Sequence, residues 1–205
     1  MELPFNPSCL CCSFAKGLMS DTYIIHKTYD TKPTKIEFED RVEYVLANLT
    51  HREDGPAIEY NDGTQIWYID GVLHNEKGPA LIGANGYTVW CVNGKLHNLN
   101  GPAVVYPDGS QEYWVDGKRH REVEPAVIWE DGTLAWYLDD NYHRIGGPAV
   151  ICKNGYTMWY VNGKLHNPNG PAVVYADGTC EYWVNGEPRS NFLICFLINI
   201  INAAA

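Results

Sequence analysis

Histidine is the residue type in this sequence whose spacing could do chemistry. Six of the seven histidines recur at intervals of 23 residues: His51, His74, His97, His120, His143 and His166. A row of imidazoles could bind zinc or transfer protons. If each 23-residue unit adds two strands to a sheet, neighbouring histidines lie about 10 Å apart, whereas zinc needs its ligands about 2 Å from one ion. The spacing therefore predicts structural histidines that bind no metal, for example by hydrogen-bonding the turn before the Gly-Pro-Ala sequence of each unit.

Apart from the histidines, the sequence shows only weak signals for a metal site or a catalytic site. Cys9, Cys11 and Cys12 form a cluster without a nearby Cys/His pair to complete a zinc site, so packing is favoured over metal binding or acylation. No Ser-His-Asp pattern, phosphate loop or His-Glu-x-x-His motif stands out in the sequence. We therefore predict no catalytic residue, no metal site and no cofactor, and we expect that the protein is not an enzyme.

Composition narrows the class of partner. The net charge is −10, which repels phosphate backbones and acidic lipid headgroups. Nucleic acid is therefore excluded as an expected partner, while membrane contact stays open. The seven cysteines lack the even spacing of a disulfide framework, which favours a reduced, cytoplasmic location. No secretory signal is evident, and no apolar run reaches the ~20 residues of a spanning helix.

The repeat predicts the fold. Each unit carries Pro-Ala, an Asp-Gly or Asn-Gly pair, and an aromatic residue at fixed distances after its histidine. Two short β-rich segments flank the first Asx-Gly pair, as in 103–106 and 110–115, and a second Asx-Gly pair ends most units. Asx-Gly between strands is typical of a two-residue type I′ turn. We therefore predict an all-β protein, an elongated single-layer antiparallel sheet of tandem β-hairpins.

A two-residue turn fixes which residues face each other. It places an aliphatic residue of the first strand opposite an aromatic residue of the second, and these pairs would form the core face: Ile58/Trp67, Leu81/Trp90, Val104/Tyr113, Val127/Trp136, Val150/Trp159 and Val173/Tyr182. The next residue of each second strand would then lie on the opposite face, across from the alanine after proline. Tyrosine and tryptophan predominate there and are typical of binding hot spots. The predicted partner-binding residues are Tyr68, Trp114, Tyr137, Tyr160 and Trp183; the alternative is that the sheet curls and shields them.

The chain divides into three regions. Residues 1–50 are predicted to be an N-terminal extension with a degenerate capping repeat, 51–188 hold six repeats, and 189–205 form an apolar C-terminal cap. The apolar run at 191–202 would cover the open sheet edge, or else mediate self-association or membrane contact. Between two similar three-repeat blocks, Glu124 and Asp140 replace glycines. Their loss of backbone freedom predicts a local distortion around 120–142.

The phrase YPDGSQEYWVDGKRH and its 23-residue period resemble the MORN repeat. The likeness covers residues 51–188, with H-x-x-x-G-P-A in place of the usual Gly-x-Gly run. In this respect the sequence is similar to a divergent MORN variant found in bacterial antitoxin-like proteins and in large DNA viruses of protists. The resemblance implies a curved rod of hairpins without catalysis of its own, in a scaffolding, dimerising or membrane-proximal role.

These observations favour a non-enzymatic scaffold that binds a protein partner, or its own copy, along an aromatic sheet face. One alternative is a structural component of a large virus particle, such as a minor capsid or cement protein, in which case the location is the host cytoplasm or the virion. Another is a carbohydrate or small-ligand binder that uses the regular tryptophan and tyrosine rows.

Overall fold

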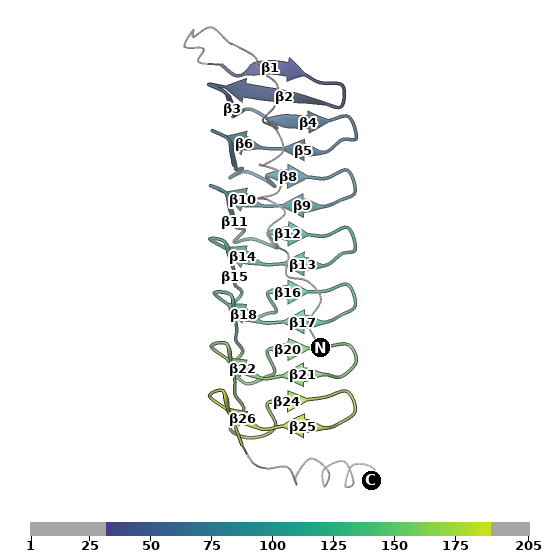
Figure 1. Cartoon of the computed structure of the whole chain (residues 1–205), viewed down its shortest axis with the longest axis vertical. Coiled ribbons are helices and arrows are strands. Elements are labelled where there is room, and N and C mark those ends of the chain that lie inside the picture. Colours follow the sequence, from purple (N-terminus) through teal and green to yellow (C-terminus); the bar gives the residue numbers. More distant parts are fainter. Residues whose placement is uncertain (1–31, 190–205) are drawn as a thin grey trace.

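The computed structural model describes residues 32–189 of the chain. Within this range every regular element is a β-strand, and the strands stack along the long axis of the molecule (Figure 1). The predicted all-β class and the open antiparallel sheet of tandem hairpins are confirmed. The predictions for the Cys9/Cys11/Cys12 cluster and for the apolar run at 191–202 fall outside the described residues.

One antiparallel sheet runs through the whole stack. Its strands are, in spatial order, β1 (Thr34–Glu37), β2 (Arg41–Leu46), β4 (Ile58–Tyr60), β5 (Gln65–Ile66), β8 (Leu81–Ile82), β9 (Thr88–Val89), β12 (Val104–Val105), β13 (Gln111–Glu112), β16 (Val127–Ile128), β17 (Leu134–Ala135), β20 (Val150–Ile151), β21 (Thr157–Met158), β24 (Val173–Val174) and β25 (Cys180–Glu181). The strand β3 (Leu49–Thr50) pairs with β2 off this path. Each repeat thus adds two neighbouring strands to the sheet, in chain order.

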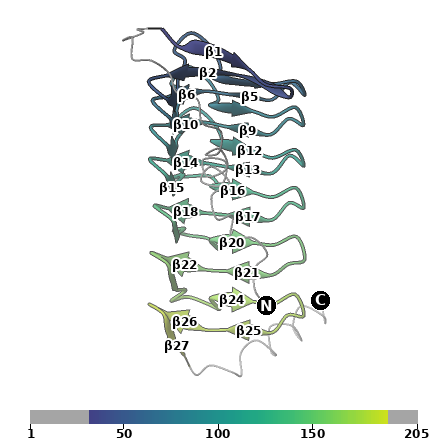
Figure 2. The same ribbon diagram turned by 45° about the horizontal axis from the view of Figure 1, so that its top comes forward.

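A second, shorter hairpin follows in every unit. These hairpins are β6–β7 (Tyr68–Ile69, Val72–Leu73), β10–β11 (Cys91–Val92, Lys95–Leu96), β14–β15 (Trp114–Val115, Lys118–Arg119), β18–β19 (Tyr137–Leu138, Asn141–Tyr142), β22–β23 (Tyr160–Val161, Lys164–Leu165) and β26–β27 (Trp183–Val184, Glu187–Pro188). Figures 1 and 2 show them stacked along one side of the main sheet. Successive short hairpins are linked by backbone bonds such as Gly94 N–H to the Leu73 carbonyl, 3.0 Å.

The second Asx-Gly pair, replaced by Asp139–Asp140 in the fourth unit, forms the type I′ turn. In the β6–β7 hairpin, Asp70 and Gly71 have φ angles of 50° and 74°, and Ile69 pairs with Val72 across them. Both central residues of a type I′ turn need positive φ, which asparagine, aspartate and glycine tolerate best. The sequence pattern therefore predicts this turn type correctly, but at the short hairpin.

The first Asx-Gly pair forms a different turn, and the prediction for it was wrong. In β4–β5 the positive φ falls on Gly63 but not on Asp62. The Gly63 N–H bonds the Tyr60 carbonyl at 3.0 Å, and the Tyr60 N–H bonds the Thr64 carbonyl at 2.9 Å. This is a three-residue loop in which a type I turn is followed by a left-handed glycine. The loop is one residue longer than predicted.

The longer loop shifts the register by one residue. Val104 pairs with Glu112 rather than with Tyr113, and Ile58 pairs with Ile66 rather than with Trp67. Because side chains alternate between the two faces of a strand, a shift of one moves a whole set to the other face. The predicted aliphatic–aromatic core pairs are therefore not cross-strand partners, and the assignment of the two faces is corrected below.

Five columns of side chains run along the stack at one residue per repeat. On face A lie the aliphatic column (Ile58, Leu81, Val104, Val127, Val150, Val173), the glutamate column (Glu43, Ile66, Val89, Glu112, Ala135, Met158, Glu181) and the second aromatic column (Tyr68, Cys91, Trp114, Tyr137, Tyr160, Trp183). On face B lie the alanine column (Ala57, Ala80, Ala103, Ala126, Ala149, Ala172) and the first aromatic column (Trp67, Trp90, Tyr113, Trp136, Trp159, Tyr182). The aliphatic and glutamate columns hold half of the buried side chains, and every alanine of the alanine column has 0% exposure.

The expected distortion around 120–142 is absent from the strand pairing. Tyr137 pairs with Tyr142 as in the other short hairpins, and Asp140 adopts the left-handed φ of 64° that glycine has elsewhere. Aspartate tolerates this conformation better than most residues. Glu124 takes the place of glycines such as Gly101 that do not have positive φ, so a side chain there causes no backbone strain.

Candidate functional site

The six histidines hold the type I′ turns. Each Nδ1 lies 2.8–3.0 Å from the side-chain oxygen of the first turn residue of its own unit: Asp70, Asn93, Asp116, Asp139, Asn162 and Asn185. In most units the backbone N–H of the same residue also reaches Nδ1, as from Asp116 to His97 at 3.2 Å. The turn that the histidines bond is therefore the Asx-Gly turn, and not the turn before Gly-Pro-Ala as expected. Among residues 32–189 no group of three or more His, Cys, Asp or Glu side chains is placed to hold a metal ion.

The turn before Gly-Pro-Ala is held by the residue after each histidine, which sequence reasoning missed. In three units it is asparagine, whose Nδ2 donates to the proline carbonyl, as Asn98 does to Pro102 at 3.0 Å. In the other three it is arginine, and Arg144 donates from Nη1 to the Pro148 carbonyl at 3.1 Å. The recurring Asn or Arg after histidine was the signal that could have revealed this.

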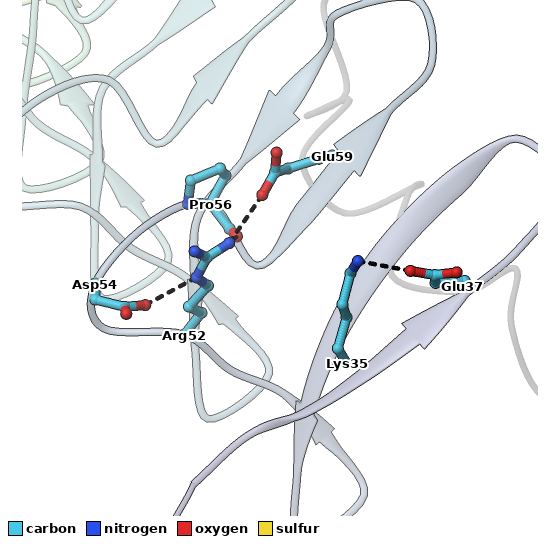
Figure 3. Close-up of polar contacts among 6 residues, drawn as sticks. All are labelled: Lys35, Glu37, Arg52, Asp54, Pro56 and Glu59. Atoms are coloured by element: carbon cyan, nitrogen blue, oxygen red, sulfur yellow. Dashed lines mark hydrogen bonds and ion pairs between the residues drawn. The ribbon is translucent and has the colours of Figure 1, made fainter.

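The arginines of these loops also cover the first aromatic column on face B. Arg121 lies 3.8 Å from the ring centroid of Tyr113, and Arg144 lies 3.7 Å from that of Trp136. Figure 3 shows the equivalent Arg52, whose guanidinium meets Asp54, Glu59 and the Pro56 carbonyl at 2.8–3.1 Å. The loops from histidine to proline therefore fold over face B.

Figure 3 also draws the exposed pair Lys35–Glu37 on β1, with Nζ 2.6 Å from Oε1. An exposed pair of this kind contributes little to stability.

The predicted partner-binding residues lie one per repeat on face A. Tyr68, Trp114, Tyr160 and Trp183 are half-buried, whereas Tyr137 is 9% exposed. Burial raises the pKa of Tyr137 because it disfavours the phenolate. The predicted neighbours were wrong, since the alanine column is flanked by the first aromatic column and not by this one: Trp67 N–H bonds the Ala80 carbonyl, and Trp90 N–H bonds that of Ala103.

Tyrosine stacking fixes the middle of the second aromatic column. The rings of Tyr137 and Tyr142 are stacked with centroids 4.4 Å apart, and Tyr142 stacks in turn on Tyr160 at 5.2 Å. Offset-stacked rings contribute beyond their buried area. Tyr137 therefore supports its neighbours from within the core, while Tyr160 is the more accessible member of the stack.

Further tyrosines extend the aromatic surface of face A to the tips of the long hairpins. Tyr87 lies against Tyr106 with ring centroids 5.6 Å apart, and Tyr156 lies against Tyr175 at 5.4 Å. Alternation along each strand places these residues on the same face as the aliphatic column. They were not predicted as site residues, because the register error concealed the continuity between the two rows.

Apolar side chains are also exposed on the loops over face B. Leu99, Val123 and Ile145 occur in three successive histidine-to-proline loops and are 73%, 82% and 75% exposed. A hollow of about 490 Å³ lies between the first two of these loops, lined by residues 98–101 and 120–122 with Tyr113 and Val115. Apolar side chains exposed singly, one per loop, are common on protein surfaces.

We expect each histidine contact to contribute independently. Replacing His97 by alanine should lower the free energy of unfolding by about 1 kcal/mol, the value of one hydrogen bond. The variant Asp116→Ala removes the partner atom of the same contact, 3.0 Å away. In denaturant unfolding, the double variant should therefore lose less than the sum of the two single losses. Zinc in the purified protein that disappears in the His97 variant would contradict a purely structural role.

Two comparisons with known proteins bear on identity. No protein-family model and no curated protein matches the chain. A tandem repeat of β-hairpins, with histidine returning every 23 residues, is what the sequence and the structure establish together. Within residues 32–189 no helix is long and apolar enough to cross a membrane.

Proposed function

We propose that this chain is a non-enzymatic scaffold of the MORN type that holds a protein partner along face A. The observation that carries the proposal is the second aromatic column, which recurs along the short hairpins beside the open sheet with half-buried Tyr68, Trp114, Tyr160 and Trp183. Tyrosine and tryptophan supply large contact areas at low cost in conformational entropy, and they dominate binding hot spots. A rigid row at a constant spacing suits an elongated partner better than a small molecule.

Rigidity of the row supports the same proposal. Strand pairing within each short hairpin, a backbone bond from the preceding loop (Arg144 N–H to the Tyr160 carbonyl, 3.1 Å) and the Tyr137–Tyr142–Tyr160 stack hold the side chains in place before a partner arrives. A pre-organised surface loses less conformational entropy on binding than a mobile one. The acidic balance of the chain, with 25 Asp and Glu against 15 Lys and Arg, favours a partner with basic residues.

Photo-cross-linking tests the proposal with a matched pair of neighbouring positions. Tyr160 and Val161 are adjacent in β22, so their side chains point to opposite faces. A photoreactive phenylalanine analogue at position 160, in the native cell, should yield one discrete cross-linked product, while the same analogue at position 161 should not.

Mass spectrometry of the product identifies the partner. A product of twice the chain mass would assign face A to contact with a second copy of this chain. Equal cross-linking from both positions, or none from position 160, would overturn the proposal that face A is the binding surface.

A further inference from the structure

Three glutamates interrupt the otherwise apolar glutamate column of face A. They are Glu43, Glu112 and Glu181, spaced by 69 residues, and the other members of the column are Ile66, Val89, Ala135 and Met158. Glu43 and Glu112 are only 8% and 7% exposed. A buried carboxylate is costly unless hydrogen bonds and an opposite charge compensate it. The next question is therefore which hydrogen-bond donors and which positive charge compensate each glutamate.

Glu112 is compensated by an arginine of its own unit. Its Oε2 accepts a hydrogen bond from Trp114 Nε1 at 2.7 Å and lies 3.6 Å from Nε of Arg119, while Tyr106 donates to Oε1 at 3.3 Å. The Arg119 guanidinium also lies over the Trp114 ring, 4.7 Å from its centroid, and 5.4 Å from that of Tyr137. A carboxylate and an aromatic face together hold one guanidinium.

Glu43 is compensated in a similar way. Its Oε1 lies 2.6 Å from Nε of Arg41, two residues earlier in β2. The guanidinium of Arg41 also lies 4.2 Å from the ring centroid of Phe38. Two of the three glutamates in the column thus pair with an arginine that itself contacts an aromatic ring.

Glu181 has the same aromatic partners as Glu112 but no such arginine. Tyr175 donates to Oε1 at 2.6 Å and Trp183 Nε1 donates to Oε2 at 2.8 Å. The residue opposite Trp183 is Pro188, whereas the residue opposite Trp114 is Arg119. Within residues 32–189 no lysine, arginine or histidine forms an ion pair with Glu181.

This carboxylate is also more open than its counterpart. The strand β25 ends the path of the main sheet, whereas β13, which carries Glu112, has strands on both sides. Tyr175 is 38% exposed. The hydrogen bond to Glu181 raises the pKa of Tyr175 to about 12, since the neutral phenol is the donor to the carboxylate. Glu181 therefore presents a charged, partly open group beside an indole ring.

We propose that Tyr175, Glu181 and Trp183 form a binding site for an arginine side chain of a partner protein, which takes the place that Arg119 occupies beside Glu112. The guanidinium pairs with the Glu181 carboxylate and stacks on the indole of Trp183. Arginine suits this site better than lysine because its planar group both donates to a carboxylate and stacks on an aromatic face. The site deepens the proposed function, and it rests on that function for the source of the arginine.

Proton–nitrogen NMR of the full chain tests the site through the indole Nε1–H of Trp183, whose signal is assigned by its loss in Trp183→Phe. The probe is N-acetyl-L-arginine amide, which presents the side chain as it occurs within a protein. We expect a saturating shift of the Trp183 signal with a dissociation constant in the millimolar range, typical of a single side chain. The citrulline analogue, of similar shape but uncharged, should cause no saturating shift.

Substitutions at Pro188 and Glu181 distinguish binding at the proposed site from non-specific binding of the probe. Pro188→Arg installs the arginine of the third repeat in the sixth and should block the probe by occupying the site, while Pro188→Ala should bind as the wild type does. Glu181→Gln should weaken binding at least tenfold. If the Trp183 signal stays unmoved by the arginine probe, or responds equally to citrulline or in Pro188→Arg, the proposed site is overturned.

The outcome is distinguishable from that of the cross-linking experiment. A silent Trp183 together with a cross-link from position 160 would overturn the arginine site and leave the scaffold in place. A saturating response of Trp183 without any cross-link would support the guanidinium site and overturn face A as a protein-binding surface. In that case, free arginine as a second probe would identify a small guanidinium compound as the ligand.

Discussion

Replacing Trp136 by alanine is expected to lower the free energy of unfolding by about 3–5 kcal/mol, as truncations of buried aromatic residues do. Trp136 is 5% exposed, and its Nε1 donates to the Val123 carbonyl at 3.1 Å. The guanidinium of Arg144 covers the ring. The substitution therefore leaves a cavity and an uncovered arginine in the middle of the array, and it removes the hydrogen bond to Val123.

Urea unfolding followed by circular dichroism measures this loss. Each unit of a repeat protein is stabilised mainly by its two neighbours, so a defect in the fourth of six units should also reduce cooperativity. We expect a smaller dependence of the free energy on urea concentration, or two separate transitions. The loss of free energy and the loss of cooperativity both follow from weakened packing of the fourth unit on its neighbours.

Trp90→Ala is the matched control. Trp90 belongs to the same column but is half-buried, and no arginine of the described residues lies over its ring. Trp90→Ala should therefore lower the free energy of unfolding clearly less than Trp136→Ala does. Equal losses for the two variants would show that covering by the loop contributes nothing, and a loss near zero for Trp136→Ala would show that face B is not part of the core.

The fold was predictable because it depends on the repeat itself. The 23-residue period, the Asx-Gly pairs and the alternating apolar residues indicate tandem hairpins whatever the register, and the strand order confirms this. The type I′ turn at Asp70–Gly71 follows from the tolerance of both residues for positive φ. These properties are local, so the sequence contains them fully.

The register was not predicted because two turn types use the same Asx-Gly pair. The signal that distinguishes them was present at Pro107, which fixes φ near −65° and favours the second position of a type I turn. The Gly109 N–H indeed bonds the Tyr106 carbonyl at 2.9 Å, which closes a turn that contains Pro107. One extra loop residue then moved the aromatic columns to the faces opposite those expected.

The composition of the candidate site was predicted better than its surroundings. The second aromatic column is visible in the sequence as Tyr68, Trp114, Tyr137, Tyr160 and Trp183, but its contacts depend on the register. Trp114 meets Glu112 and Arg119 within its own unit, whereas the stacking of Tyr142 on Tyr160 depends on how two successive units pack. Contacts of this kind are long-range, and the sequence pattern alone does not fix them.

The alanine column gives the other prediction with a large effect. Ala126 is 0% exposed, and strand pairing places Tyr113 on one side of it and Trp136 on the other. Small residues between large rings let neighbouring units approach to the spacing of paired strands. The repeated alanine after proline therefore sets the packing of the first aromatic column.

Ala126→Leu should lower the free energy of unfolding by about 1–3 kcal/mol, because the added carbons push two rings from their rotamers. Urea unfolding measures the loss, and fluorescence of the tryptophans should show a more exposed environment in the native state. The effect should not add to that of Trp136→Ala, since the cavity left by the indole accommodates the leucine. The double variant is therefore expected to be more stable than the sum of the two losses implies.

Ala176→Leu is the matched control for the same chemical change. Ala176 is exposed at the tip of the last long hairpin, so the substitution should change stability by no more than about 0.5 kcal/mol. If Ala126→Leu were as mild as Ala176→Leu, the alanine column would not set the spacing between units. The recurrence of alanine at positions 57, 80, 103, 126, 149 and 172 would then need an explanation other than packing.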